Sequence, residues 1–217
     1  MDWVAVVQQL DRDLLAIEMV GKGLQRQEIE IRSTSLFDKE TGVPVSKAEF
    51  KEIGAACMIV SQVGMEALIG LIANSIETFA IRLKRHLNIK WEPFAKPKNH
   101  VRYADRVRQF RALNNVFKHQ EGYVKSATSE HAKFLVANGY CENEIYLKHL
   151  TADSIVPSFE LALYETFTHL FEICVEASNL PNDLDEKSGV ALVNALRYRA
   201  IYPIIRQSIT GTKSEHT

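Results

Sequence analysis

Residues 53–73 read IGAACMIVSQVGMEALIGLIA, and this stretch decides the fold class that the sequence predicts. It lies in a run of about 40 residues without proline, from Ser46 to Asn88, which would form a helix of about 60 Å if unbroken. Ser46 and Glu49 fit a capping box, in which each side chain accepts a hydrogen bond from the backbone N–H of the other residue. Because the stretch is apolar on almost every side, we predict that it is the central, buried helix of an all-helical protein.

Polar and small residues within this stretch limit what the helix can be. Gln62 and Glu66 are rare inside a membrane-spanning helix unless they have a functional role, so we predict no membrane segment here. Three glycines, Gly54, Gly64 and Gly70, lower the intrinsic helix propensity. They predict either close contacts with a neighbouring helix or a break in the helix near one of them.

The composition is that of one ordinary globular domain. The chain has 217 residues, and 26 lysines and arginines nearly balance 27 aspartates and glutamates. A basic field over the whole surface is therefore excluded, and any nucleic-acid site must be a local patch. The three cysteines are widely spaced, odd in number and without a C-x-x-C pair, which predicts buried thiols in a reducing compartment. With no signal peptide evident at the N-terminus, we expect a cytoplasmic protein.

Hydrophobic periodicity and turn residues predict the remaining elements. We expect helices over 2–31, 104–120, 128–138, 157–178 and 185–208, the last one kinked at Pro203, and a brief extended piece at 144–147. Residues 1–217 are expected to form a single helical domain with an N-terminal helix or arm (2–31), a core (46–178) and a C-terminal helix (185–208). The predicted architecture is an all-α helical bundle with long antiparallel helices.

The helix predicted over 104–120 has one polar face. At about 100° per residue, four side chains fall within about 80° of one another, namely Arg108, Arg111, Asn115 and His119. Lys118 lies at the edge of this face. The opposite face is apolar, with Phe110, Leu113 and Phe117. One side of the helix is therefore expected to pack on the core, while the other presents two guanidiniums, an amide and an imidazole.

These groups suit the chemistry of RNA phosphates. Arginine donates fixed, bidentate hydrogen bonds to phosphate oxygens, and histidine moves protons near neutral pH. RNA supplies its own nucleophile, the 2′-hydroxyl, so we expect neither a metal nor another cofactor. The alternative is an ordinary solvated helix surface, in which Lys118 and His119 complement the helix dipole from the last turn.

A motif on this helix resembles the signature of HEPN superfamily domains. Residues 111–122 read RALNNVFKHQEG, and residues 76–79 read IETF in the long helix before them. The superfamily motif is an arginine, often followed by a polar residue such as asparagine, and then a histidine after four to six residues. The resemblance covers residues 50–180 loosely and implies a helical bundle that dimerises so that two motifs face each other. It also implies metal-independent RNA cleavage through attack by the 2′-hydroxyl, as in bacterial toxins and antiviral systems.

The sequence departs from this motif at the arginine. Counting back from His119, the expected arginine position holds Asn114, and Arg111 leaves seven residues before His119. Asn115 and His119 match the Asn-x-x-x-His part of the motif directly. Arg111 lies on the same face of the helix as His119 and can replace the missing arginine. Otherwise the site is degenerate, and the domain is a non-catalytic dimerisation or protein-interaction module.

The polar face and the resemblance together assign roles to its residues. His119 would handle the proton of the 2′-hydroxyl or of the leaving group, Arg111 would hold the scissile phosphate, and Asn115 would orient either of them. Arg108 and Lys118 would support phosphate binding. The expected partners are RNA as substrate, a second copy of the chain in a homodimer, and a neutralising or regulatory protein. Such an endoribonuclease would act as a toxin or antiviral effector.

Two other patterns allow further hypotheses. Residues 90–100 combine basic residues with Trp91 and Phe94, which fits either stacking of single-stranded RNA or two aromatic side chains that pin the connector to the core. Glu165 and His169 form an i, i+4 pair that predicts a contact on the helix surface. A two-iron carboxylate site would need duplicated Glu-x-x-His pairs, which the sequence lacks, and its seven histidines have no zinc spacing.

Overall fold

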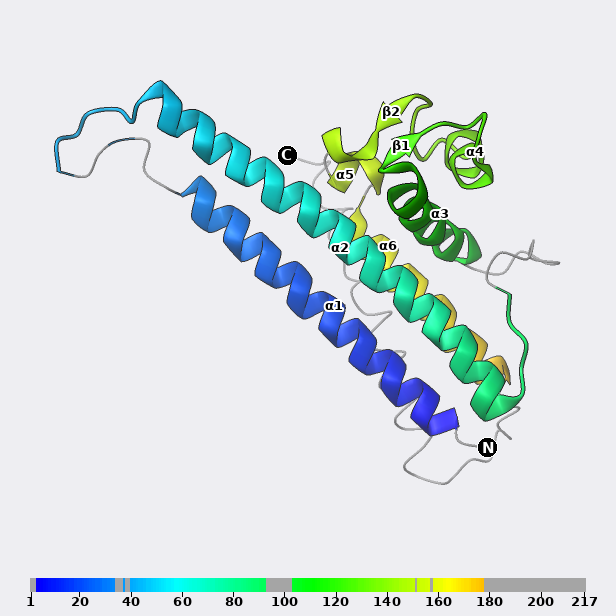
Figure 1. Ribbon diagram of the computed structural model, residues 1–217. Helices are drawn as coiled ribbons and strands as arrows, with labels where there is room; N and C mark the ends of the chain where they lie inside the picture. The colour runs from blue at the N-terminus through cyan, green and yellow to red at the C-terminus, as the bar shows by residue number, and fades with distance from the viewer. Residues whose placement is uncertain are drawn as a thin grey trace, which may run out of the picture.

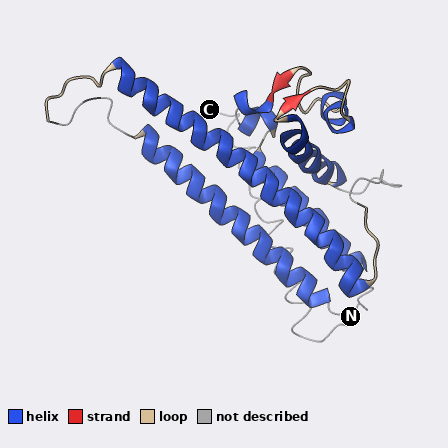
Figure 2. Cartoon of the chain, in the orientation of Figure 1, coloured by secondary structure: helices blue, strands red, loops and turns tan. Residues whose placement is uncertain are grey.

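The computed structural model describes residues 3–33, 37, 40–92, 103–150, 152–156 and 158–177, and these are mostly helical (Figure 2). The helices are α1 (Trp3–Arg32), α2 (Lys47–Leu87), α3 (Ala104–Gln120), α4 (Glu130–Ala137), α5 (Ala152–Ile155) and α6 (Phe159–Ala177). The other elements are the short strands β1 (Tyr123–Val124) and β2 (Ile145–Tyr146) and the 3-10 turn η1 (Leu147–His149). The predicted all-helical class is confirmed, and the extended piece expected at 144–147 includes β2. The helix predicted over 185–208 and the side chain of Phe94 lie outside the described residues.

α2 is one continuous helix with a defined signal at each end. The predicted capping box is present, because the Ser46 Oγ accepts the Glu49 N–H at 3.2 Å and the Glu49 carboxylate accepts the Ser46 N–H at 2.7 Å. The helix ends at Asn88, whose backbone is left-handed with φ 55°. The helix does not break at its glycines. Gly64 lies instead against α1, where a Cβ atom would come within 2.9 Å of the Leu24 methyl groups.

α1 and α2 lie side by side and antiparallel (Figure 1). α1 presents an apolar stripe to the core that includes Leu10 and Leu14, both fully buried. Arg82, near the end of α2, donates to the Asp13 carboxylate at 2.9 Å in the first half of α1. Leu24, in the second half of α1, contacts Gly64 near the middle of α2. These two pairs define the register of the antiparallel hairpin.

α6 lies along α2 and connects the hairpin to α3 (Figure 1). The Tyr164 hydroxyl donates to Glu18 of α1 at 2.6 Å, and Arg106 of α3 donates to Glu165 at 2.5 Å. The predicted surface pair of Glu165 and His169 is wrong. His169 is only 4% exposed, and Glu165 forms its ion pair with Arg106 on another helix.

The prediction that α2 is buried on every side is wrong for its N-terminal half. Met58, Ile59 and Val63 are 59–61% exposed, and only 22% of the most apolar window of the helix is buried. α2 extends past α3 and α6, so its first turns pack mainly against α1 (Figure 1). By length and composition α2 is also apolar enough to cross a membrane, a test that the core helix of a soluble protein passes as well.

A short connection between α3 and α4 determines where α4 lies. After α3 the chain turns at Gly122, with φ 76°, and enters β1, which pairs with β2 in antiparallel register with Tyr123 opposite Tyr146. α4 then begins at a capped end, where the Ser129 hydroxyl accepts the Ala132 N–H at 3.3 Å. The connection turns the chain back so that α4 packs against α3.

Trp91 anchors the chain just after α2. Its ring meets Phe79 edge-to-face, with ring centroids 5.3 Å apart, and it also lies beside His169 of α6. Trp91 is half-buried and packs against the core. Of the two hypotheses for this connector, the structure favours core packing for Trp91.

Candidate functional site

α3 packs with its apolar side inward and its polar side outward. Phe110 and Leu113 are fully buried, and Phe117 is 8% exposed. We use the term α3 polar face for the four residues that the sequence placed together: Arg108, Arg111, Asn115 and His119. Along this face burial decreases toward the C-terminus, because the first three side chains are half-buried and His119 is exposed, as is the adjacent Lys118.

Position 114, where the motif expects arginine, lies outside the α3 polar face. Asn114 is 5% exposed, and a Cβ atom on Gly70 of α2 would lie 3.8 Å from its side-chain oxygen. An arginine at this position would therefore point into the packed contact between α3 and α2. Arg111 is the arginine that shares a face with His119, despite the longer spacing.

Arg111 is held at the junction of α3 and α2. Its Nη2 atom lies 3.5 Å from a carboxylate oxygen of Glu77 on α2. Burial lowers the pKa of the Arg111 guanidinium, and the negative charge of Glu77 opposes that shift. An arginine remains charged at neutral pH under any such shift. Arg111 thus places a permanent positive charge at the site, and its ion pair with Glu77 is a long one.

Arg108 lies between α3 and α4. Its guanidinium stacks on the Phe134 ring of α4, 4.5 Å from the ring centroid, and Nη1 lies 3.4 Å from Asp105. Its Nε atom is buried and has no hydrogen-bond partner among the described residues. A cation on an aromatic face stabilises the contact between the two helices. Arg108 therefore helps to hold α4 against α3.

His131 of α4 lies beside the α3 polar face, and no motif in the sequence points to it. Its Nε2 atom lies 3.1 Å from the Asn115 side-chain nitrogen. Burial is the main cause that lowers the His131 pKa, and the positive charges of Arg111 and His119 lower it further. Glu130, its neighbour in the chain, opposes this shift. We call Arg111, Asn115, His119 and His131 the histidine cluster.

No helical periodicity links His131 to His119, because the two lie on different helices. The only signal in the sequence is a histidine in the first turn of the helix predicted over 128–138. This histidine points to the site only once α4 is known to pack against α3. The packing of the two helices, rather than a motif, brings the second imidazole to the site.

The histidine cluster combines the groups that phosphoryl chemistry uses. It contains one guanidinium, one amide and one imidazole on consecutive turns of α3, and a second imidazole on the first turn of α4. A guanidinium binds a phosphate oxygen through directed hydrogen bonds, and imidazoles transfer protons near neutral pH. Among the described residues no group of three or more His, Cys, Asp or Glu side chains is arranged to hold a metal ion.

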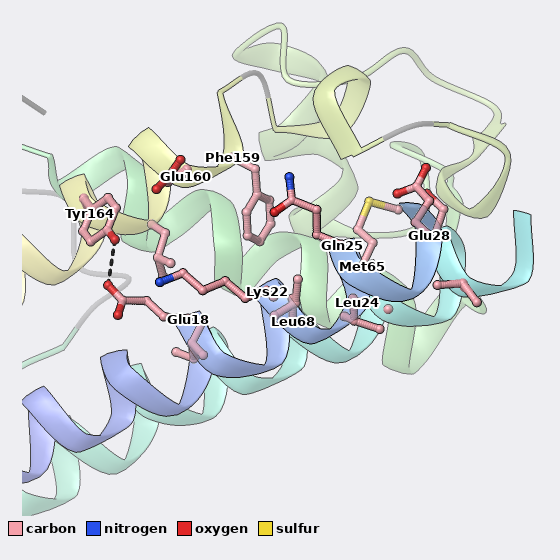
Figure 3. Close-up of a pocket in the computed structure, with 16 residues that line it drawn as sticks. Glu18, Lys22, Leu24, Gln25, Glu28, Met65, Leu68, Phe159, Glu160 and Tyr164 are labelled. Atoms are coloured by element: carbon pink, nitrogen blue, oxygen red, sulfur yellow. Dashed lines mark hydrogen bonds between the residues drawn. The ribbon is translucent and has the colours of Figure 1, made fainter. Parts of the chain in front are cut away.

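A concave surface lies on another part of the molecule (Figure 3). It is a groove of about 370 Å³ between α1, α2 and the start of α6. Met65, Leu68 and Phe159 form part of its apolar lining, and Glu28 and Glu160 are among its acidic residues. No residue of α3 or α4 lines it, so the groove and the histidine cluster are separate sites.

Comparisons of this chain with models of protein families, with curated proteins and with solved structures find no match. Its function must therefore be inferred from its own residues and geometry.

Proposed function

We propose that this chain is a HEPN-like endoribonuclease that cleaves RNA without a metal ion and works as a homodimeric helical bundle in the cytoplasm. The 2′-hydroxyl of the substrate attacks the adjacent phosphate. His119 handles the proton of this hydroxyl or of the leaving group, and Arg111 holds the phosphate. Asn115 orients these groups, and Lys118 adds positive charge at the exposed end. The enzyme acts as a toxin or antiviral effector, with a neutralising or regulatory protein as partner.

The observation that carries this proposal is the arrangement of Arg111, Asn115 and His119 on consecutive turns of one face of α3. Arg111 can exchange its single 3.5 Å contact with Glu77 for two shorter, parallel hydrogen bonds to two oxygens of a phosphate. The nearby positive charges also favour an anionic ligand over a neutral one. Arg108 contributes through the position of α4, given its stacking on Phe134.

The exposed part of α2 supports the proposed homodimer. Ile59 and Val63 lie within about 40° of Gly70 and Glu77 on the helix, which are the positions that face α3. α3 runs antiparallel to α2, so its His119 end points toward Ile59 and Val63. We call these two exposed residues the α2 strip. A second copy that covers the α2 strip would bring its own histidine cluster close to the first one.

An RNA-cleavage assay tests the proposal. Purified protein is incubated with a fluorophore–quencher RNA oligonucleotide in EDTA, beside a His119→Ala variant. We expect cleavage by the unchanged protein and a loss of at least about 100-fold in the variant, because one positioned acid or base contributes this much. Lys133→Gln, an exposed change on α4, serves as the control. If the unchanged protein and His119→Ala cut equally, or if neither cuts, the enzyme proposal fails.

A non-catalytic interaction module is the second candidate. The observation that favours it is the number of large apolar side chains exposed on the hairpin of α1 and α2, including Met19, Met58 and Ile59. Exposed apolar patches of this kind often mark protein-interaction surfaces. This candidate predicts a dimer or a stable complex with no RNA cleavage, and it predicts that His119→Ala leaves complex formation unchanged.

A further inference from the structure

Cleavage of RNA by its 2′-hydroxyl requires two proton transfers. One group must take the proton from the attacking hydroxyl, and a second must give a proton to the departing 5′-oxygen. The proposed function assigns only His119 to this work, and one imidazole cannot hold both positions at the same time. The histidine cluster contains a second imidazole, that of His131, whose Nε2 atom lies 3.1 Å from the Asn115 side-chain nitrogen.

We propose that His131 is a catalytic residue that accepts the proton of the RNA 2′-hydroxyl, while His119 donates a proton to the 5′-oxygen of the leaving nucleotide. This inference rests on the proposed ribonuclease function and adds a residue that the α3 polar face does not include.

The contact with Asn115 positions His131 for this role. The amide nitrogen of Asn115 lies 3.1 Å from Nε2, where it donates to the lone pair of a neutral imidazole. A 2′-hydroxyl is a donor of the same kind and can replace the amide at that nitrogen. Asn115 thus keeps the ring turned so that Nε2 faces the α3 polar face and its proton stays on Nδ1.

The packing of α4 keeps the imidazole in place. The Ser129 cap fixes the first turn of α4, which holds His131, and the stacking of Arg108 on Phe134 attaches α4 to α3 about one turn further on. A base that is held rigidly next to its substrate is more effective than one on a mobile segment. The half-buried position also removes part of the water that would compete for Nε2.

The charges that face His131 keep it ready to accept a proton. Arg111 and His119 approach it from α3, and Glu130 acts from its own helix. Burial and the two positive groups lower the pKa of His131, whereas Glu130 raises it. The ring is therefore neutral at neutral pH, which is the form that a general base requires.

The atoms of the step balance without a further reactant. The 2′-oxygen forms a bond to phosphorus, the bond from phosphorus to the 5′-oxygen breaks, and no electron is gained or lost. The proton of the 2′-hydroxyl passes to Nε2 of His131, and a proton of His119 passes to the 5′-oxygen. The products are a 2′,3′-cyclic phosphate and a 5′-hydroxyl, and the two histidines return to their first states by exchange with water.

Two substrates that differ in their leaving group separate the two histidines. The first is an RNA oligonucleotide, and the second is uridine 3′-(p-nitrophenyl phosphate), whose p-nitrophenolate departs without protonation. The full chain is compared with His131→Gln, His119→Gln and the control Lys133→Gln. We expect His131→Gln to slow both substrates by about 100- to 10,000-fold, and His119→Gln to slow only the RNA to that extent.

Imidazole rescue separates a chemical role from a structural one. A His131→Ala variant leaves space beside Asn115, and added imidazole should restore cleavage in proportion to its neutral fraction. Loss of activity in this variant without rescue would overturn the inference. So would cleavage of both substrates by His131→Gln at the unchanged rate, or slowing of the RNA alone, and in these cases the proposed function stands. If the unchanged protein cleaves neither substrate, the proposed function falls and this inference falls with it.

Discussion

The low pKa of His131 makes the stability of the fold depend on pH. In the unfolded chain this histidine takes up a proton near its ordinary pKa of about 6.5, whereas in the folded chain burial and Arg111 lower that pKa. Between the two values the unfolded state binds more protons, so the free energy of unfolding decreases as the pH falls. This contribution is fully present above the unfolded pKa and is lost as the pH falls through the folded one.

We therefore expect His131→Gln to weaken the pH dependence of stability on the acid side. The measurement is the urea midpoint at about pH 7.5 and about pH 5.5 for the unchanged protein and the variant. Lys84→Gln, an exposed change on α2, is the control. An equal decrease of the midpoint in the unchanged protein and in His131→Gln would show that His131 is not held neutral in the fold.

Two of the three cysteines are predicted to be unreactive in the native protein. Burial raises the pKa of the Cys174 thiol to about 12 and that of Cys141 to about 11. Because the thiolate is the reactive form, iodoacetamide at about pH 8 should leave Cys174 unlabelled in the native protein and label it in guanidinium. Mass spectrometry of the peptides measures this. Labelling of Cys174 at equal rates in both conditions would mean that α6 does not pack as described.

For single residues, the sequence predicts the helix face on which a side chain lies better than the residues of other helices that it contacts. Helical periodicity correctly placed Arg111, Asn115 and His119 on one side of α3, because it depends only on residues within one helix. It could not predict that Arg108 stacks on Phe134, since that contact depends on where α4 lies. For the same reason His131 was missed, although it lies 3.1 Å from a predicted site residue.

Among the helices, the glycines of α2 provide a matched pair of tests. A Cβ atom added at Gly54 would have no atom within 4 Å, whereas one added at Gly64 would lie 2.9 Å from Leu24 of α1. Gly54→Ala should stabilise the protein by up to about 1 kcal/mol through helix propensity. Gly64→Ala should lose this gain, because the Leu24 methyl groups must move aside to admit the new Cβ atom.

Urea unfolding of the two glycine variants measures this difference. The double variant Gly64→Ala with Leu24→Ala should recover part of the loss, because the smaller side chain makes room for the new methyl group. If Gly54→Ala and Gly64→Ala change the midpoint by the same amount and in the same direction, α1 and α2 do not approach closely at Gly64.

Helix boundaries follow from local signals, but burial does not. The capping box at Ser46 and the left-handed Asn88 define α2 almost where the sequence predicted. Its apolar composition suggested burial on every side, yet Ile59 and Val63 are exposed. The composition of a helix shows how much apolar surface it could bury. The lengths of α3 and α6 determine how much of α2 they cover, and both are much shorter than α2.

In the molecule as a whole, the exposed α2 strip should be the dimer contact. Burying two large aliphatic side chains on each of two copies removes apolar surface from water, which favours association. The variant Ile59→Lys with Val63→Lys places charges in this contact without touching the histidine cluster. We expect the unchanged protein to be a dimer by light scattering and the double variant to be a monomer with reduced RNA cleavage.

A matched variant and a lipid assay give this last prediction its controls. Met19→Lys changes an equally exposed apolar residue on α1, 66% exposed, and should leave the dimer intact.

The apolar length of α2 provides a competing explanation for the α2 strip, namely contact with lipid. Sedimentation with phosphatidylcholine vesicles separates the two explanations. If the unchanged protein is a monomer that binds vesicles, and Ile59→Lys with Val63→Lys releases it, the strip contacts lipid and the dimer is wrong. If the protein stays in solution as a dimer that only the double variant dissociates, two histidine clusters belong to one functional unit.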